Sequence, residues 1–464
     1  MLESLLALQA RLNAWVWGVP MLTALIGVGC YLAVRLRFVQ FAHFGTAWRQ
    51  TFGTAFRKGP GGDGDVSPLQ ALAVAMGGTV GVGNIAGVAT AVALGGPGAV
   101  FWMLVSGLIG MGTKFAEVVL GVHYRRREPG QPMLGGPMVY IEHGLGRRWR
   151  WLALLFAAFG ALAAFGIGNM VQANAVAEGM SHFGVSRWAT GGTLVLVVGL
   201  VTVGGIRRIA RVATFCVPFM CGLYMLAAVG LILLHAARLP AAAALVLRHA
   251  FTPVAATGGF AGAAVMAAMR YGFARGVFSN EAGLGSAPMA HATAIVEHPV
   301  RQGLWGIMEV FVDTVVMCTA TALVILLTGA WESGESGATL TMRAFAHGYG
   351  RPVGYALVVV SMVLTAYDTL LAWCFYGETC AAYLLGHGTW VRPAYRLLWL
   401  PFSLVGALGG LEAVWGVADT LNGLMAVPNV IALFGLAGVV AQLTRGFFGQ
   451  QPYAPPAPGP ASRP

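Results

Sequence analysis

Charge is scarce in this sequence. Of its 464 residues only 10% are charged, whereas 57% are hydrophobic, and the mean hydropathy is +0.73. A soluble domain carries about 25% charged residues, so the composition excludes a soluble globular protein. It predicts an all-α polytopic membrane protein, with room for roughly ten helices of about 20 residues each.

Signatures of catalysis and of resident metals are also missing. The sequence contains no Gly-x-Ser-x-Gly, His-Glu-x-x-His or Walker A motif. Its six cysteines lie in apolar segments and never in a Cys-x-x-Cys spacing, which is typical of small buried residues. The ten histidines form no pair at metal-ligand spacing on a helix. We therefore predict neither an enzyme nor a cofactor.

The net charge of +11 does not indicate a nucleic-acid partner. The basic residues gather in short loops between apolar segments, as the positive-inside rule describes. With the N-terminus outside, nineteen Lys and Arg residues fall on the inner side and six on the outer side. The predicted partner is therefore the lipid bilayer. The predicted location is the cell (inner or plasma) membrane, with a cytoplasmic C-terminus.

Eleven apolar segments have the length of a membrane span. They cover residues 15–36, 68–94, 98–122, 150–178, 188–204, 212–236, 256–290, 302–329, 352–385, 394–410 and 414–443. The first run lacks a strong basic region before it and a clear cleavage site, so it is interpreted as a retained helix. Segment 352–385 exceeds one straight crossing, which predicts a tilt or a bend.

The second segment is interrupted by the sequence from Gly77 to Gly87. Five of these eleven residues are glycine, and glycine gains least from being helical. Unwound backbone survives in a membrane only where it is buried in protein or lines a cavity. We therefore predict a broken helix with free carbonyls and amides at mid-membrane. Thr79 and Asn84 add side-chain oxygens beside this break.

A second stretch, from Val277 to Ser286, repeats the Asn-x-Ala-Gly of the first. The predicted topology makes the two broken segments antiparallel, as in transporters built from inverted repeats. The chain then divides into an extra N-terminal helix and loop, two five-helix repeats and a disordered tail. These parts cover residues 1–67, 68–236, 256–443 and 451–464.

Ionisable residues within spans suggest functional sites, because they are expensive in lipid. Lys114 and Glu117 are spaced to pair on one helix face, and this structural pairing competes with a functional role. Arg270, Arg275 and Glu281 surround the second break. Glu281 has two possible interpretations. It either anchors the unwound backbone or an arginine, or it binds the substrate.

Polar residues also occur within other spans. Gln172 offers a hydrogen-bond donor and an acceptor, as amino-acid recognition needs. The sequence leaves open whether Gln172 contacts the substrate or does not. Glu178 and Asp313 are assigned to gating or packing. Hydrogen bonds between helices are expected of three residues in the last span, Asp419, Asn422 and Asn429.

The ninth segment carries oxygens suited to a small cation on Asp368 and Thr369. Trp373 follows Thr369 by one helical turn and is near the same face. It is interpreted either as a wall beside a small apolar side chain or as an ordinary packing aromatic.

Several long motifs strongly resemble the alanine or glycine:cation symporter family. They are Gly81–Ala91, Leu94–Trp102, Thr113–Val118, Gly135–Met138, Phe278–Pro288, Phe311–Thr314, Cys318–Ile325 and Trp373–Glu378. The resemblance extends from about residue 15 to 443. It implies a leucine-transporter-type fold and sodium-driven uptake of alanine or glycine by alternating access, with sodium as the coupling ion.

The resemblance also implies a site between the broken second and seventh spans and the fourth and ninth spans. The residues that would line the substrate are Thr79, Gly83, Asn84, Gln172, Asn280 and Trp373. The residues that would hold the sodium ion are Gly81, Asp368 and Thr369.

The sequence departs from the family pattern at three places near this site. Gly77-Gly78 replaces the usual Ala-Ala, Val82 replaces a threonine, and Asp368 replaces a small hydroxyl residue. A buried carboxylate can hold a proton near neutral pH, so Asp368 either strengthens cation binding or permits proton coupling. A proton-coupled carrier of the same fold and a non-transporting amino-acid sensor stay as alternatives. The oligomeric state is not predicted.

Overall fold

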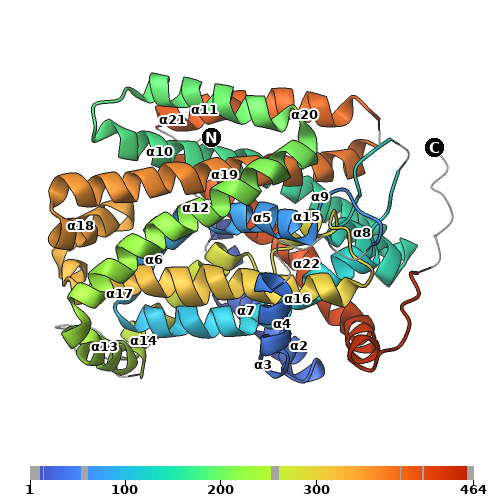
Figure 1. The fold of residues 1–464 in the computed structure, drawn as a ribbon, viewed down its shortest axis with the longest axis horizontal. Coiled ribbons are helices and arrows are strands. Elements are labelled where there is room, and N and C mark those ends of the chain that lie inside the picture. The colour runs from blue at the N-terminus through green and yellow to red at the C-terminus, as the bar shows by residue number, and fades with distance from the viewer. Residues whose placement is uncertain are drawn as a thin grey trace.

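The computed structural model describes residues 11–13, 15–53, 61–128, 130–251, 261–386, 388–409 and 412–456. Regular structure in these ranges is helical, and β-pairing there is limited to three isolated bridges. Figure 1 shows long helices such as α7, α16 and α19 running along the long axis of the molecule. The prediction of an all-α protein is confirmed.

The N-terminal half contains the first broken segment. Its elements are α2 (Val19–Arg35), α3 (Val39–Ala42), α4 (Phe44–Phe52), α5 (Pro68–Thr79), η1 (Gly83–Gly87), α6 (Val88–Gly95), α7 (Gly98–His123), α8 (Pro137–Tyr140), η2 (Ile141–Leu145), η3 (Arg147–Trp149), α9 (Arg150–Phe165), η4 (Gly166–Met170), α10 (Val171–Ser181), α11 (Arg187–Thr202) and α12 (Gly205–Leu234). Helix α5 begins with a capping box between Ser67 and Gln70, with Pro68 at its first turn.

The C-terminal half contains the second broken segment. Its elements are η5 (Ala236–Arg238), α13 (Leu239–Phe251), α14 (Ala261–Asn280), α15 (Ala287–His291), α16 (Pro299–Val310), η6 (Phe311–Cys318), α17 (Thr319–Leu327), η7 (Ala330–Ser333), α18 (Gly337–Tyr349), α19 (Arg351–Leu385), α20 (Val391–Trp399), α21 (Pro401–Leu408) and α22 (Glu412–Phe448). Helix α19 accommodates its 35 residues as one uninterrupted element.

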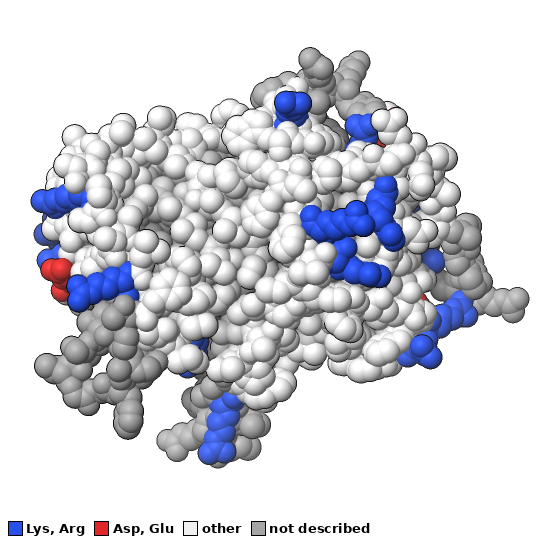
Figure 2. Space-filling view, turned by 90° about the horizontal axis from the view of Figure 1, so that it is seen from below, with Lys and Arg blue, Asp and Glu red and all other residues white. Residues whose placement is uncertain are grey.

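The helices have the length and surface of a multi-pass membrane protein. Six helical segments of the described chain are long and apolar enough to cross a bilayer, or seven if the bent pair of α5 with η1 and α6 is one span. Figure 2 shows charged side chains at the left end and over the right half of this face, with largely uncharged surface between them. All eleven predicted segments overlap helices, but the count of eleven spans stays a prediction.

The first break is shorter than its glycine content predicts. Helix α5 continues to Thr79, and after Val80 to Val82 the chain becomes helical again with the wider turns of η1. The two helical parts meet at an angle of 48°. Gly77 and Gly78 therefore remain helical, and the predicted unwinding from Gly77 to Gly87 is wrong except at its centre.

The second break is formed by left-handed backbone. Helix α14 ends at Asn280, and Glu281, Gly283 and Gly285 follow with φ of 54°, 95° and 86°. Glycine adopts this region readily, whereas a glutamate there is disfavoured. The chain becomes helical again at Ala287.

The division into two inverted repeats stays a prediction. Residues 252–260 at the start of the second repeat and 457–464 of the tail lie outside the described residues. Within the described chain, α5 packs against α12 and α19, and α14 packs against α6 and α7. These contacts place both breaks in the interior of the helical bundle.

Candidate functional site

Two glycines bring the first broken segment close to α19. A Cβ atom added at Gly77 would lie 3.2 Å from Cβ of Asp368, and one added at Gly78 would lie 2.9 Å from the Tyr376 hydroxyl. The Gly77-Gly78 pair thus permits close helix packing, which explains why these glycines do not unwind the helix. Two departures from the family pattern, the glycine pair and Asp368, lie against each other.

Three buried polar side chains around this contact carry oxygen atoms without a hydrogen-bond partner. Within the described chain, neither carboxylate oxygen of Asp368 has a partner, and the same holds for Oε1 of Gln172 and the hydroxyl of Tyr376. Asp368 is only 1% exposed. Nearly all buried polar groups in proteins are satisfied. Acceptor oxygens left over in this way fit a ligand that brings donors or positive charge.

Gly81 stands between Thr369 and Gln172. A Cβ atom added at Gly81 would lie 2.8 Å from Oγ1 of Thr369 and 3.7 Å from Oε1 of Gln172. The Thr369 hydroxyl lies 2.9 Å from the carbonyl oxygen of Gly77. The amide of Gln172 donates to the carbonyl of Ile167 at 3.1 Å, so its own oxygen faces the break. Gly81, Thr369 and Gln172 thus lie close together, and Gly77 contacts both Asp368 and Thr369.

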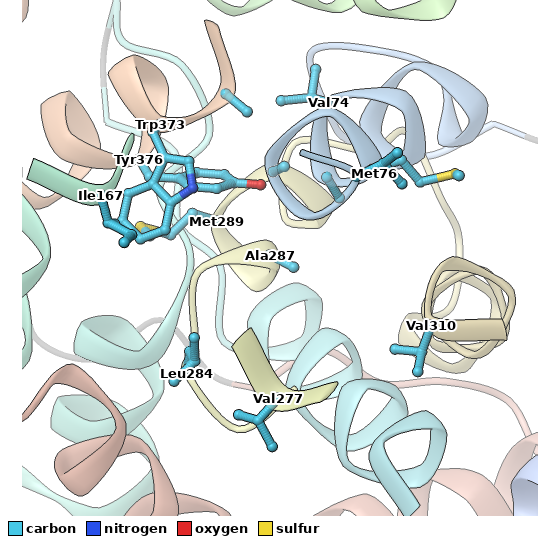
Figure 3. Close-up of a cluster of buried hydrophobic side chains, with 14 of the residues drawn as sticks. Val74, Met76, Ile167, Val277, Leu284, Ala287, Met289, Val310, Trp373 and Tyr376 are labelled. Atoms are coloured by element: carbon cyan, nitrogen blue, oxygen red, sulfur yellow. The ribbon is translucent and has the colours of Figure 1, made fainter. Parts of the chain in front are cut away.

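Trp373 lies on α19, as Asp368 and Thr369 do, and contacts both the fourth span and the second break. Its side chain packs on Gly168 of η4, and its Nε1 donates to Oε1 of Glu281 at 3.1 Å. The ring is 5.7 Å from that of Tyr376. Figure 3 shows the two aromatic side chains adjacent to each other, with the Tyr376 hydroxyl directed toward α5.

Glu281 anchors the second break, as one of its two predicted roles requires. One carboxylate oxygen accepts from Trp373, and the other accepts from the Ser286 hydroxyl at the far end of the break. The nearby arginines make other contacts: Arg270 lies over Tyr271 and Arg275 over Phe278. The carboxylate thus connects the break to α19 rather than to an arginine.

The two asparagines of the repeated motif have matching roles. Oδ1 of Asn84 accepts from the Gly81 amide at 3.0 Å, and Oδ1 of Asn280 accepts from the Ala282 amide at 2.9 Å. Each asparagine also donates to η6: Asn84 to Oδ1 of Asp313 at 2.6 Å and Asn280 to Oγ1 of Thr314 at 3.1 Å. Both breaks are therefore held by neighbouring residues of the eighth segment.

Thr79 and Gly83, the other two residues predicted to line the substrate, contact different parts of the protein. The Thr79 hydroxyl lies 3.3 Å from the carbonyl oxygens of Ala75 and Met76 in its own helix. A Cβ atom added at Gly83 would lie 3.4 Å from the ring of Phe278. Thr79 is thus bonded within α5, and Gly83 packs against the second broken segment.

The predicted pairing of Lys114 with Glu117 is wrong. Nζ of Lys114 lies 3.2 Å from Oε1 of Glu309 on α16, and Oε2 of Glu309 lies 2.8 Å from Nε2 of His291. Glu117 instead accepts from the Gly283 amide at 3.0 Å and from Asn429 at 2.6 Å. Partners on other elements replace the neighbour on the same helix.

Asp313 and Tyr376 contribute more to this interior than the sequence predicts. Asp313 was assigned only to gating or packing, yet it accepts hydrogen bonds from Asn84, Ser279 and Thr314. A carboxylate within an apolar span is the feature of the sequence that points to a functional role for Asp313. Tyr376 carries no such signal in the sequence, because a tyrosine is not ionised at neutral pH.

Comparisons with known proteins agree with this arrangement. The model of the sodium:alanine symporter family matches residues 2–455. An uncharacterized transporter of Haemophilus influenzae is 46% identical over 452 residues, which are 96% of each chain. The sodium/alanine symporter AgcS of Methanococcus maripaludis is 42% identical over 451 residues, which are 95% of this chain and 97% of AgcS.

A solved structure supports the fold. MhsT in complex with L-phenylalanine matches with a TM-score of 0.52 at 12% identity, over 82% of this chain and 98% of MhsT. The leucine-transporter-type fold implied by the motifs is confirmed. Because the family model and both relatives extend over nearly the whole length, this chain belongs to the sodium:alanine symporter family.

Proposed function

We propose that this symporter imports alanine or glycine together with sodium by alternating access. The observation that carries the proposal is a pair of buried residues with unpaired oxygens: Asp368, which packs on Gly77 near the end of α5, and Gln172, which faces Gly81 in the first break. Membership in a family of amino-acid and cation symporters supports it, as does the name of the relative AgcS, a sodium/alanine symporter.

The amino acid lies between the first break and α19 in this proposal. Its carboxylate binds free amides where η1 begins, because helix N-termini favour anions. Its ammonium group donates to Oε1 of Gln172, which is buried and unpaired. Trp373 walls the side-chain end, which leaves room only for a small substituent. Thr79, Gly83, Asn84 and Asn280 then shape the two breaks rather than touch the cargo through their side chains.

The cation lies next to the amino acid. Asp368 offers two unpaired carboxylate oxygens, Thr369 a hydroxyl and Gly81 a carbonyl, and sodium is a hard cation that takes oxygen ligands. An ion bound there stabilises the break that also binds the amino acid. Each ligand therefore raises the affinity for the other by the same factor.

Proton coupling is the second candidate, and the buried position of Asp368 is the observation that favours it. A carboxylate at this depth can exchange a proton instead of holding a sodium ion. The carrier would keep its fold and its amino-acid site, and only the identity of the driving ion would differ.

Uptake of labelled alanine into proteoliposomes tests both candidates. An inward sodium gradient at equal pH should drive accumulation, and an inward proton gradient without sodium should not. The opposite result would favour the proton carrier. The Asp368→Ser variant should alter the dependence on sodium or on pH, and an unchanged dependence would remove Asp368 from the cation site. Absence of labelled-alanine counterflow in the unaltered protein would favour a sensor.

A further inference from the structure

A basic pocket lies where α2 and α22 end, far along the chain from the breaks. Its cavity has a volume of about 470 Å³ and is lined by Arg35, Arg37, His43, Thr444, Arg445 and Phe448, among others. We propose that this basic pocket binds the phosphate headgroup of an anionic phospholipid. The inference does not depend on the proposed cargo or ion.

The pocket concentrates positive charge without a protein counter-charge. Arg35, Arg37 and Arg445 are all exposed and line it together, and its lining contains no acidic residue. None of the ion pairs within the described part of the chain involves these three arginines. Guanidinium groups bind phosphate oxygens through paired hydrogen bonds, so a phosphate supplies the missing partner.

The local backbone brings the arginines together. Helix α2 ends at Arg35, and Arg37 and Phe38 follow with φ of 55° and 53°. Two successive left-handed residues other than glycine are unfavourable, and they turn the chain back toward α22. The His43 ring then stacks on Phe448 with centroids 3.6 Å apart. Burial lowers the pKa of His43, so the positive charge of the pocket belongs to the arginines.

The surroundings suit the boundary between lipid and water. Phe38 and Phe41, which lie between the lining residues Arg37 and His43 in the sequence, are 49% and 52% exposed, and Trp48 on the following α4 is 47% exposed. Exposed aromatic rings are typical of the headgroup level of a membrane. Figure 1 shows α2, α3 and α4 grouped at one margin of the molecule. Basic pockets between the ends of membrane helices bind anionic headgroups on the cytoplasmic side, the side on which the topology prediction places these residues.

Lipid binding to the full-length protein in neutral detergent tests the proposal. Phosphatidylglycerol and phosphatidylcholine would be titrated separately, with bound lipid counted by native mass spectrometry and the Tm followed in parallel. Phosphatidylglycerol should bind and raise the Tm, and phosphatidylcholine should do so much less. In the triple variant Arg35→Gln/Arg37→Gln/Arg445→Gln, the affinity for phosphatidylglycerol should fall by about tenfold or more.

A matched variant on the same predicted side controls for charge. Arg207, Arg208 and Arg211 are exposed at the start of α12, and Arg207→Gln/Arg208→Gln/Arg211→Gln should retain phosphatidylglycerol binding. An equal loss in both triple variants would overturn the proposal, because it would indicate attraction to net charge alone.

Two further measurements complete the test, one on the source of the phosphate and one on a single variant. If inorganic phosphate at millimolar concentration raises the Tm as much as phosphatidylglycerol does, the pocket is a site for a free anion and the lipid proposal fails. If the pocket triple variant does not fold, the single variant Arg37→Gln replaces it. That variant should still weaken phosphatidylglycerol binding, and unaltered binding would count against the proposal.

Discussion

The contact between Gly78 and Tyr376 makes a quantitative prediction. In Gly78→Ala the new Cβ would lie 2.9 Å from the Tyr376 hydroxyl and 3.1 Å from its ring. Tyr376 is fully buried and packs against Trp373, so the ring has little freedom to yield. Overpacking of this kind costs about 1–3 kcal/mol, whereas replacing a helical glycine by alanine gains roughly 0.5–1 kcal/mol. We expect a net destabilisation of up to about 2.5 kcal/mol.

A double-mutant cycle isolates the contact. Tyr376→Phe removes a buried hydroxyl that has no partner in the described chain, and alone it should be nearly neutral. The double variant Gly78→Ala/Tyr376→Phe should recover much of the lost stability, since the closest of the atoms facing the new Cβ is gone. The measurement is the Tm of each purified variant in detergent, accompanied by its initial rate of alanine uptake.

Gly87 provides the matched control. It lies in the same broken segment, and a Cβ atom added there would meet nothing within 4 Å. Gly87→Ala should therefore match or exceed the unaltered protein in stability. Equal Tm values for Gly78→Ala and Gly87→Ala would refute the close packing of α5 on α19. A double variant no more stable than Gly78→Ala would refute the role of the hydroxyl.

Three other variants test neighbouring parts of the site. Trp373→Ala should admit larger neutral amino acids, seen as inhibition of labelled-alanine uptake by valine or leucine; unchanged selectivity would remove Trp373 as the wall. Lys114→Met leaves the carboxylate of Glu309 buried without its ammonium partner and should lower the free energy of unfolding by about 3–5 kcal/mol. The Tm of Lys114→Met/Glu309→Met should fall less than that of Lys114→Met, and equal losses of Tm would contradict the ion pair. Gly81→Ala should raise the alanine concentration for half-maximal uptake, because its Cβ would lie 2.8 Å from Oγ1 of Thr369; an unaltered value would place the cargo away from Gly81.

The sequence predicted the parts of this fold that depend on local composition. Apolar length indicated the helices, and the repeated Asn-x-Ala-Gly indicated two related breaks at Asn84 and Asn280. Both asparagines do hold their breaks, through the amides of Gly81 and Ala282. These interactions span only two or three residues, whereas the sequence assigned both asparagines to the substrate.

Contacts between distant elements were beyond sequence reasoning. Lys114 was paired with Glu117 because spacing reveals only neighbours on one helix, whereas the structure supplies Glu309 from 195 residues away. The glycines at 77 and 78 were expected to unwind the helix, but they permit close packing on α19. Glycine favours both outcomes, and only the partner helix decides between them.

Binding of labelled alanine to the purified protein, measured across a range of sodium concentrations, tests the central claim most directly. The claim is that Asp368 at the first break holds the coupling cation next to the amino acid. The unaltered protein should bind alanine more tightly as sodium rises, and Asp368→Asn should lose that dependence. Asp419→Asn changes a half-buried carboxylate, which accepts from Asn13 at 3.2 Å, and should retain it. The same sodium dependence in Asp368→Asn as in the unaltered protein would contradict the account.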